Sequence, residues 1–121
     1  MSHGGITHIE LHTRDLAASR RFYEEIFRWE FKITPGWDTY ARFTTPDGQE
    51  GGFDAGPRAD APSDKGPILY IEVDDIDAAL GRIERMDGRA LVRKTKISDE
   101  FGYFALFLDN VGNRLGLWSR T

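Results

Sequence analysis

The segment ITHIELHTRDL (residues 6–16) has a counterpart later in the chain, ILYIEVDDI (residues 68–76). In both segments apolar residues alternate along a predicted half-buried strand, and an aspartate then opens a helix. Asp15 and Asp75 are the two expected N-caps. Two turns repeat as well, because PDGQ (46–49) and NVGN (110–113) each lead into a short strand with a central glycine. The chain therefore reads as a duplication of one structural unit.

Each copy is predicted to form a β-α-β-β-β module. The first has strands at 6–13, 31–34, 39–44 and 50–54 and a helix at 16–27. The second has strands at 68–73, 90–97, 103–108 and 114–119 and a helix that starts at Ile76 and that Gly88 can end. The predicted fold class is α+β: two modules, about 1–55 and 68–121, form a curved mixed sheet around a cup. Residues 56–67 are expected to link them within a single domain spanning 1–121.

Composition excludes several classes of protein. The chain has 121 residues, of which 40% are hydrophobic and 30% charged, as in one soluble globular domain. It has no apolar run long enough to cross a bilayer and no secretory signal at its start, so we expect a cytoplasmic protein without a membrane partner. Cysteine is absent, which excludes disulfides and thiol catalysis. A net charge of −4 without a basic cluster argues against nucleic acid as a partner.

This layout resembles the vicinal oxygen chelate superfamily, which includes glyoxalase I, extradiol dioxygenases, and the bleomycin and fosfomycin resistance proteins. The matching residues are His8, Asp15-Leu16, Arg21-Phe22-Tyr23 and the closing stretch DNVGNRLGL (109–117). The resemblance covers nearly the whole chain and implies the glyoxalase/bleomycin resistance/dioxygenase fold. For the enzymes of the family it also implies one divalent metal ion, held by four ligands from the first and last strands of the two modules.

The four metal-ligand positions that the resemblance implies fall on His8, about Gly52, Ile68 and Gly116. Of these only His8 has a side chain that can bind a metal. We therefore expect no standard metal centre and no cofactor. An atypical metal site involving His8 stays an alternative, but His8 and His12 would be about 13 Å apart on one strand. That separation is too large for both to bind one ion.

Strand alternation selects the side chains that would line the cup, because residues two apart share a face. The predicted ligand-binding residues are His8, Glu10, His12, Arg42, Tyr70, Glu72, Arg114 and Trp118. The alternative is that the carboxylates are ordinary surface groups and that the histidines are structural. No catalytic residue is assigned, although His12 and Glu72 together could act as a general acid/base pair.

The sequence thus favours a metal-independent protein that binds a small organic ligand in the cup. Two other functions stay open. One is a glyoxalase-related lyase, isomerase or dioxygenase with an atypical site, and the other is a non-catalytic structural or regulatory module. Family members usually pair, so the resemblance implies a homodimer. The cup could then form within one chain or across two.

Overall fold

The structure is a computed structural model that describes residues 3–57 and 61–121. Arg58, Ala59 and Asp60 of the predicted linker, like the first two residues of the predicted domain, lie outside the described residues. In chain order the elements are β1 (Ile9–His12), α1 (Leu16–Phe27), β2 (Glu30–Lys32), β3 (Tyr40–Thr44), β4 (Glu50–Asp54), β5 (Tyr70–Glu72), α2 (Ile76–Arg85), β6 (Arg89–Ser98), β7 (Gly102–Leu108) and β8 (Arg114–Ser119).

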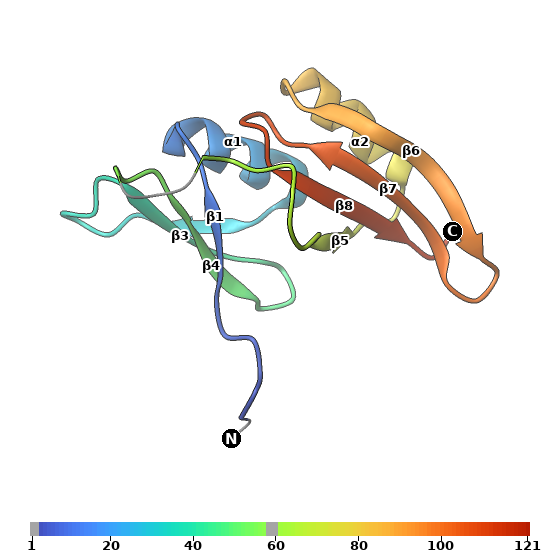
Figure 1. The fold of residues 1–121 in the computed structure, drawn as a ribbon, viewed down its shortest axis with the longest axis horizontal. Coiled ribbons are helices and arrows are strands. Elements are labelled where there is room, and N and C mark those ends of the chain that lie inside the picture. Colours follow the sequence, from blue (N-terminus) through green and yellow to red (C-terminus); the bar gives the residue numbers. More distant parts are fainter. Residues whose placement is uncertain (1–2, 58–60) are drawn as a thin grey trace. The chain divides into compact units, whose positions relative to one another are not determined.

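The chain divides into two compact units, Met1–Pro62 and Ser63–Thr121 (Figure 1). Each unit contains one helix and one four-stranded sheet, with strand orders β1-β4-β3-β2 and β5-β8-β7-β6. In each sheet the first and last strands of the unit pair in parallel, and the other pairs are antiparallel. Two β-α-β-β-β modules of the predicted α+β class are therefore confirmed.

Both helices begin where the sequence predicts. The carboxylates of Asp15 and Asp75 each accept a hydrogen bond of 3.0 Å from the backbone three residues on, at Ala18 and Ala78. Each bond satisfies one of the free N–H groups of the first helical turn. The prediction that Gly88 ends the second helix is wrong in detail, because the left-handed residue there is Asp87, with φ 71°. Aspartate tolerates this conformation better than most residues do.

Four predicted strands are shorter in the structure, because pairing with a neighbour sets their length; the one predicted at 39–44 loses only its first residue. The strand predicted at 6–13 pairs with β4 only over Ile9–His12, and Ile6 is largely exposed. The strands predicted at 31–34 and 68–73 pair over Glu30–Lys32 and Tyr70–Glu72. In these strands the alternation of apolar and polar residues continues past the last paired residue, so the sequence alone overestimates their length.

Aromatic rings make the core of the first unit. Tyr23 of α1 stacks on Trp29 with a centroid separation of 4.5 Å and lies 5.3 Å from Phe53 of β4. Trp29 in turn stacks on Phe43 of β3 at 4.5 Å. These contacts place the odd-numbered residues of β3 and β4 on the helix side of the sheet. The even-numbered residues of the same strands consequently face away from α1.

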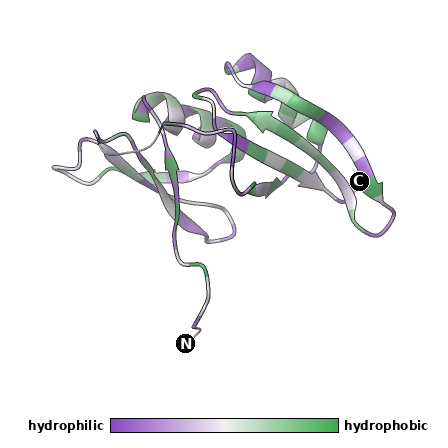
Figure 2. Cartoon of the chain, viewed as in Figure 1, coloured by the Kyte–Doolittle hydropathy of each residue, from purple (hydrophilic) through white to green (hydrophobic). Residues whose placement is uncertain are grey.

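Strand β6 is an edge strand of the second sheet. Figure 2 shows hydrophilic and hydrophobic segments alternating along it, and its basic residues include Arg93, Lys94 and Lys96. Arg93 pairs with Glu84 of α2 at 2.7 Å. Charged side chains on an edge strand oppose pairing with a further strand. Among the helices of the described residues, none has the length and apolarity needed to cross a membrane.

Candidate functional site

The face of the first sheet that points away from α1 is polar on all four strands. Strand register aligns Glu10 with Gly52 and Gly52 with Arg42, and Arg42 in turn with Lys32. The next row aligns His12, Asp54 and Tyr40. We call this surface the polar face; it consists of His8, Glu10, His12, Glu30, Lys32, Tyr40, Arg42, Thr44, Glu50, Gly52 and Asp54. A sheet face that lacks aliphatic side chains is typical of a surface in contact with water or a ligand, not of a core.

Tyr40 lies across the centre of the polar face. Its ring covers Gly52, so that a Cβ atom at position 52 would clash with the ring. Its hydroxyl reaches over β4 to His8, where the Oη to Nε2 distance is 2.7 Å. The missing side chain at Gly52 therefore allows a direct link between β3 and the segment that leads into β1.

The Tyr40 hydroxyl also forms a hydrogen bond with the Glu10 carboxylate. Because a carboxylate only accepts and a phenol has one proton, Tyr40 donates to Glu10 and accepts from the Nε2–H of His8. Burial, the Glu10 hydrogen bond and the negative charges of Glu10 and Asp54 raise the pKa of Tyr40 to about 12. The phenol therefore keeps its proton at neutral pH. The result is a short relay of donors from His8 through Tyr40 to Glu10.

His12 lies beside this relay. Its Nε2 lies 3.6 Å from a carboxylate oxygen of Glu10. A carboxylate of the same strand therefore lies close to His12, and the pairing of His12 with Glu72 stays a prediction. We call His8, Glu10, His12 and Tyr40 the tyrosine cluster. Trp37 lies edge-on to the Tyr40 ring, with centroids 6.1 Å apart, and is half exposed.

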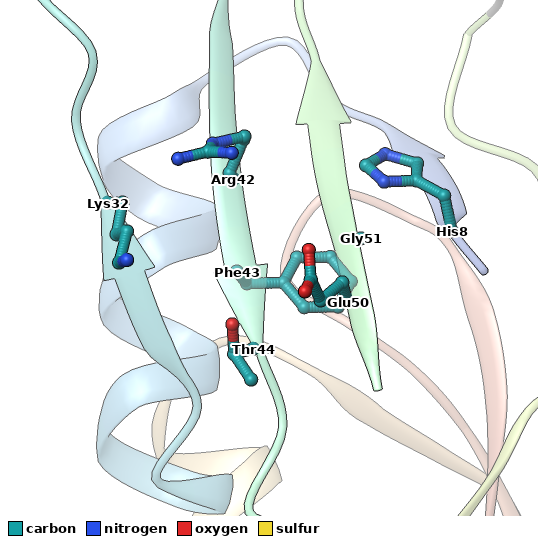
Figure 3. A pocket seen from close by; sticks show the side chains of 7 residues that line it. All are labelled: His8, Lys32, Arg42, Phe43, Thr44, Glu50 and Gly51. Atoms are coloured by element: carbon teal, nitrogen blue, oxygen red, sulfur yellow. The ribbon is translucent and has the colours of Figure 1, made fainter. Parts of the chain in front are cut away.

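A pocket opens on the polar face beside the tyrosine cluster (Figure 3). Its volume is about 160 Å³. Strands β2 and β3 contribute Lys32, Arg42 and Thr44, and Glu50 of β4 lies between Arg42 and His8 in Figure 3. The described residues that line it are His8, Lys32, Arg42, Phe43, Thr44, Glu50 and Gly51. The pocket thus combines two cations, one carboxylate, one hydroxyl and one imidazole.

The second unit has a corresponding face of different character. Tyr70 lies opposite Gly116, and its ring covers that glycine as Tyr40 covers Gly52. Glu72 is exposed and lies opposite Trp118, whose indole N–H donates to the carbonyl of Phe101 at 2.7 Å. Arg114 donates to the carbonyl of Gly66 at 3.0 Å. Trp118 and Arg114 therefore fix nearby loops.

Of the eight predicted ligand-binding residues, the structure brings His8, Glu10, His12 and Arg42 together on the polar face. The other four, Tyr70, Glu72, Arg114 and Trp118, lie on the second sheet. The sequence reasoning did not include Tyr40, Lys32, Thr44 and Glu50 in the site. The sequence did contain a signal that Tyr40 and Thr44 face away from the core, because they alternate with Ala41 and Phe43, which are buried.

The residues present do not fit a metal ion at the positions that the family resemblance implies. Gly52, Ile68 and Gly116 carry no donor atom in their side chains, and the Nε2 of His8 is bound to Tyr40. Tyrosine rings lie over both glycines. Within residues 3–57 and 61–121, no group of three or more His, Asp or Glu side chains is arranged to hold a metal ion.

Comparison with known proteins identifies the family. Residues 5–117 match the model of the Glyoxalase/Bleomycin resistance protein/Dioxygenase superfamily. CFP32 of Mycobacterium tuberculosis, which carries the provisional name of a glyoxylase, is 30% identical over 115 residues. That match covers 91% of this chain but only 43% of CFP32, so the chain spans less than half of this relative. A glyoxylase-like domain-containing protein of Didymella fabae is 25% identical, with 98% of this chain and 95% of that protein covered.

Solved structures agree at the level of the fold. The fosfomycin resistance protein FosX of Listeria monocytogenes, complexed with Mn(II) and a dihydroxypropylphosphonic acid, superposes with a TM-score of 0.77 at 18% identity. The match covers 99% of this chain and 93% of that one. The family model spans both β-α-β-β-β units and the strands that carry the polar face. The chain therefore belongs to the glyoxalase/bleomycin resistance protein/dioxygenase superfamily.

Proposed function

We propose that this chain binds a small organic molecule on the polar face of its first sheet and that it does so without a metal ion. One observation carries the proposal: the Tyr40 phenol covers Gly52 and links His8 to Glu10 beside an open pocket. A concave site with a few fixed polar groups is what small-molecule recognition requires. For Tyr70, Glu72 and the ring of Trp118, which lie on the second sheet, a ligand-binding role stays a prediction.

Ligand-induced thermal shifts test this function. The chain, treated with EDTA, is screened by fluorimetry against a broad panel of metabolites. A ligand at 100 times its Kd adds about 2.7 kcal/mol to the free energy of unfolding, which raises the Tm by several degrees. The shift should be lost in Tyr40→Phe and kept in Arg21→Gln, a matched control on the exposed side of α1.

Metal independence has its own readout in the same experiment. Adding Mn²⁺, Ni²⁺ or Zn²⁺ after EDTA treatment should leave each ligand shift unchanged. A shift that appears only with a metal would contradict this part of the proposal and favour a metalloenzyme. The absence of any shift across the panel, with or without metal, would contradict ligand binding and favour a structural or regulatory module.

A second candidate function is a lyase or isomerase that moves a proton. The specific observation in its favour is the relay from His8 through Tyr40 to Glu10, with His12 at 3.6 Å from Glu10. Imidazoles and carboxylates in contact are suited to general acid/base catalysis. Ligands found by thermal shift can be incubated with the protein in ²H₂O and followed by NMR. Exchange of a carbon-bound proton that depends on His12 would support the enzyme, and its absence would exclude this role for those ligands.

We further propose a cytoplasmic homodimer. Strand β2 is an edge strand of the first sheet, and large apolar side chains are exposed next to it at Ile33 and Trp37. Pairing of copies would bury such side chains. Light scattering after size-exclusion chromatography tests this: a mass of twice 13.8 kDa is expected, and a monomer at all concentrations would contradict it.

A further inference from the structure

We propose that the pocket of the polar face recognises a small hydroxycarboxylic acid with a single negative charge. The inference deepens the proposed function and rests on it, because it names the class of ligand that this face would hold. The observation behind it is that cationic donors line one side of the pocket and acceptors line the other.

The cationic side of the pocket is formed by Lys32 and Arg42. The two residues are direct partners in the β2–β3 register, so their like charges lie opposite each other. Such a cross-strand pair is destabilising when nothing neutralises it. Within the described part of the chain, neither side chain forms an ion pair. A bound anion would remove this repulsion, and the planar guanidinium of Arg42 suits the two oxygens of a carboxylate.

The opposite side of the pocket offers acceptors. Glu50 of β4 contributes a carboxylate that forms no ion pair with any described residue. His8 also lines the pocket, and its Nε2 is bound to the Tyr40 hydroxyl. A ligand that places its carboxylate against Lys32 and Arg42 would therefore need a hydrogen-bond donor at its other end. A hydroxyl group meets this requirement.

The sum of charges selects among anions. Among the lining residues, Lys32 and Arg42 contribute two positive charges and Glu50 one negative charge, so these three side chains together carry a single positive charge. A monocarboxylate balances this charge, whereas a phosphate dianion would face Glu50 with an excess of negative charge. A zwitterionic amino acid would leave the positive charge unbalanced. The volume of about 160 Å³ restricts the group that enters to a few heavy atoms.

Glycolate is the simplest probe of this class, and three relatives isolate its features. Acetate lacks the hydroxyl, glycolamide lacks the charge, and glycine replaces the hydroxyl with an ammonium group. Each compound, and inorganic phosphate, is titrated at constant ionic strength into ¹⁵N-labelled protein. For a ligand of this size we expect a Kd on the order of 1 mM for glycolate, with shifts at the amides of Thr44 and Gly51. Acetate, glycolamide, glycine and phosphate should each bind more weakly.

Variants connect the binding to the pocket. Arg42→Gln and Lys32→Gln should each weaken glycolate by about tenfold or more, because a charge-assisted hydrogen bond is lost. Arg21→Gln on α1 makes the same change of charge away from the pocket and should leave the Kd unchanged. The Glu50→Gln variant loses a negative charge in the pocket, so it should bind acetate and phosphate more tightly than the original chain does. This gain of binding cannot come from unfolding.

Three results would overturn the inference: no binding of glycolate, equal binding in Arg42→Gln and in the original chain, or phosphate binding tighter than glycolate. The same experiments distinguish a failure of this ligand class from a failure of the proposed function. If another compound from the thermal-shift panel binds through Tyr40 while glycolate does not, the proposed function stands and only the ligand class is wrong. If no compound binds at all, both are wrong.

Discussion

The substitution Tyr40→Phe removes one oxygen atom. It should lower the free energy of unfolding at neutral pH, and it should lower it much less at high pH. The ring can still cover Gly52 in this variant, so the change isolates the hydroxyl. That hydroxyl accepts from His8 at 2.7 Å and donates to Glu10. A neutral hydrogen bond contributes about 1 kcal/mol to stability and one to a charged group about 1.5–3 kcal/mol. Because the cluster is open to water, which can replace both partners, we expect a loss of about 1–2 kcal/mol at pH 8.

The sign of the pH dependence follows from the raised pKa. The pKa of Tyr40 is about 12 in the folded chain, against 10.0 for an unperturbed tyrosine. Between these values the folded state holds a proton that the unfolded state has released, so stability falls as pH rises. The stabilisation is complete below pH 10 and is lost as pH passes through about 12. Solvent screening reduces the contribution of this partly exposed group to about 1 kcal/mol.

Two measurements check this expectation. Urea unfolding of the original chain and of Tyr40→Phe, at several pH values from 8 to the highest at which both fold, gives the difference in free energy of unfolding. Other titrating groups act on both proteins alike, so a difference that shrinks above pH 10 reports on Tyr40. The tyrosinate absorbance at 295 nm, subtracted between the two proteins, gives the pKa directly. A difference in stability that does not change with pH, or a titration midpoint near 10, would refute the reasoning.

Three further predictions concern the scaffold. Asp109 is buried and accepts backbone hydrogen bonds of 3.0, 2.9 and 2.9 Å in the turn before β8, so Asp109→Ala should cost about 3 kcal/mol in urea unfolding; a loss below 1 kcal/mol would contradict this. Asp15→Ala and Asp75→Ala should each cost about 1 kcal/mol, and a zero effect of either in urea unfolding would show that its cap is not used. Gly116→Ala should displace the Tyr70 ring, visible as altered Tyr70 ring resonances in NMR spectra, whereas unchanged resonances would contradict the close contact.

Much of the fold could be predicted because its signals are local. The caps at Asp15 and Asp75 and the turn at Asp47-Gly48 depend on residues close in sequence, and the helix start at Leu16 follows from the first cap. The alternation of side chains along the first strand also placed His8, Glu10 and His12 on one face, since residues two apart share a face in any strand. Strand ends were less accurate, because pairing with a neighbour decides them.

The site was predicted only in part, for a physical reason. The sequence showed Gly52 and Gly116 where relatives would carry metal ligands, but it could not show what occupies the space beside them. Tyr40 pairs with Asp54 of β4, and its ring reaches back over Gly52, two residues away along that strand. This side-chain conformation depends on contacts with three strands. In the strand predicted at 31–34, Lys32 alternates with the apolar Phe31 and Ile33, but the sequence did not show that Lys32 would lie opposite Arg42.

The sequence by itself determined that two similar units exist and where their helices begin, because these properties are carried by residue identity and local spacing. It also has glycine or isoleucine at three of the four positions where the family resemblance implies metal ligands. Only the tertiary structure decided what replaces them. Strand register placed Lys32 opposite Arg42, and the open space above Gly52 allowed Tyr40 to reach His8. Contacts between strands distant in sequence depend on the register of the whole sheet, and that register created the pocket and its charge.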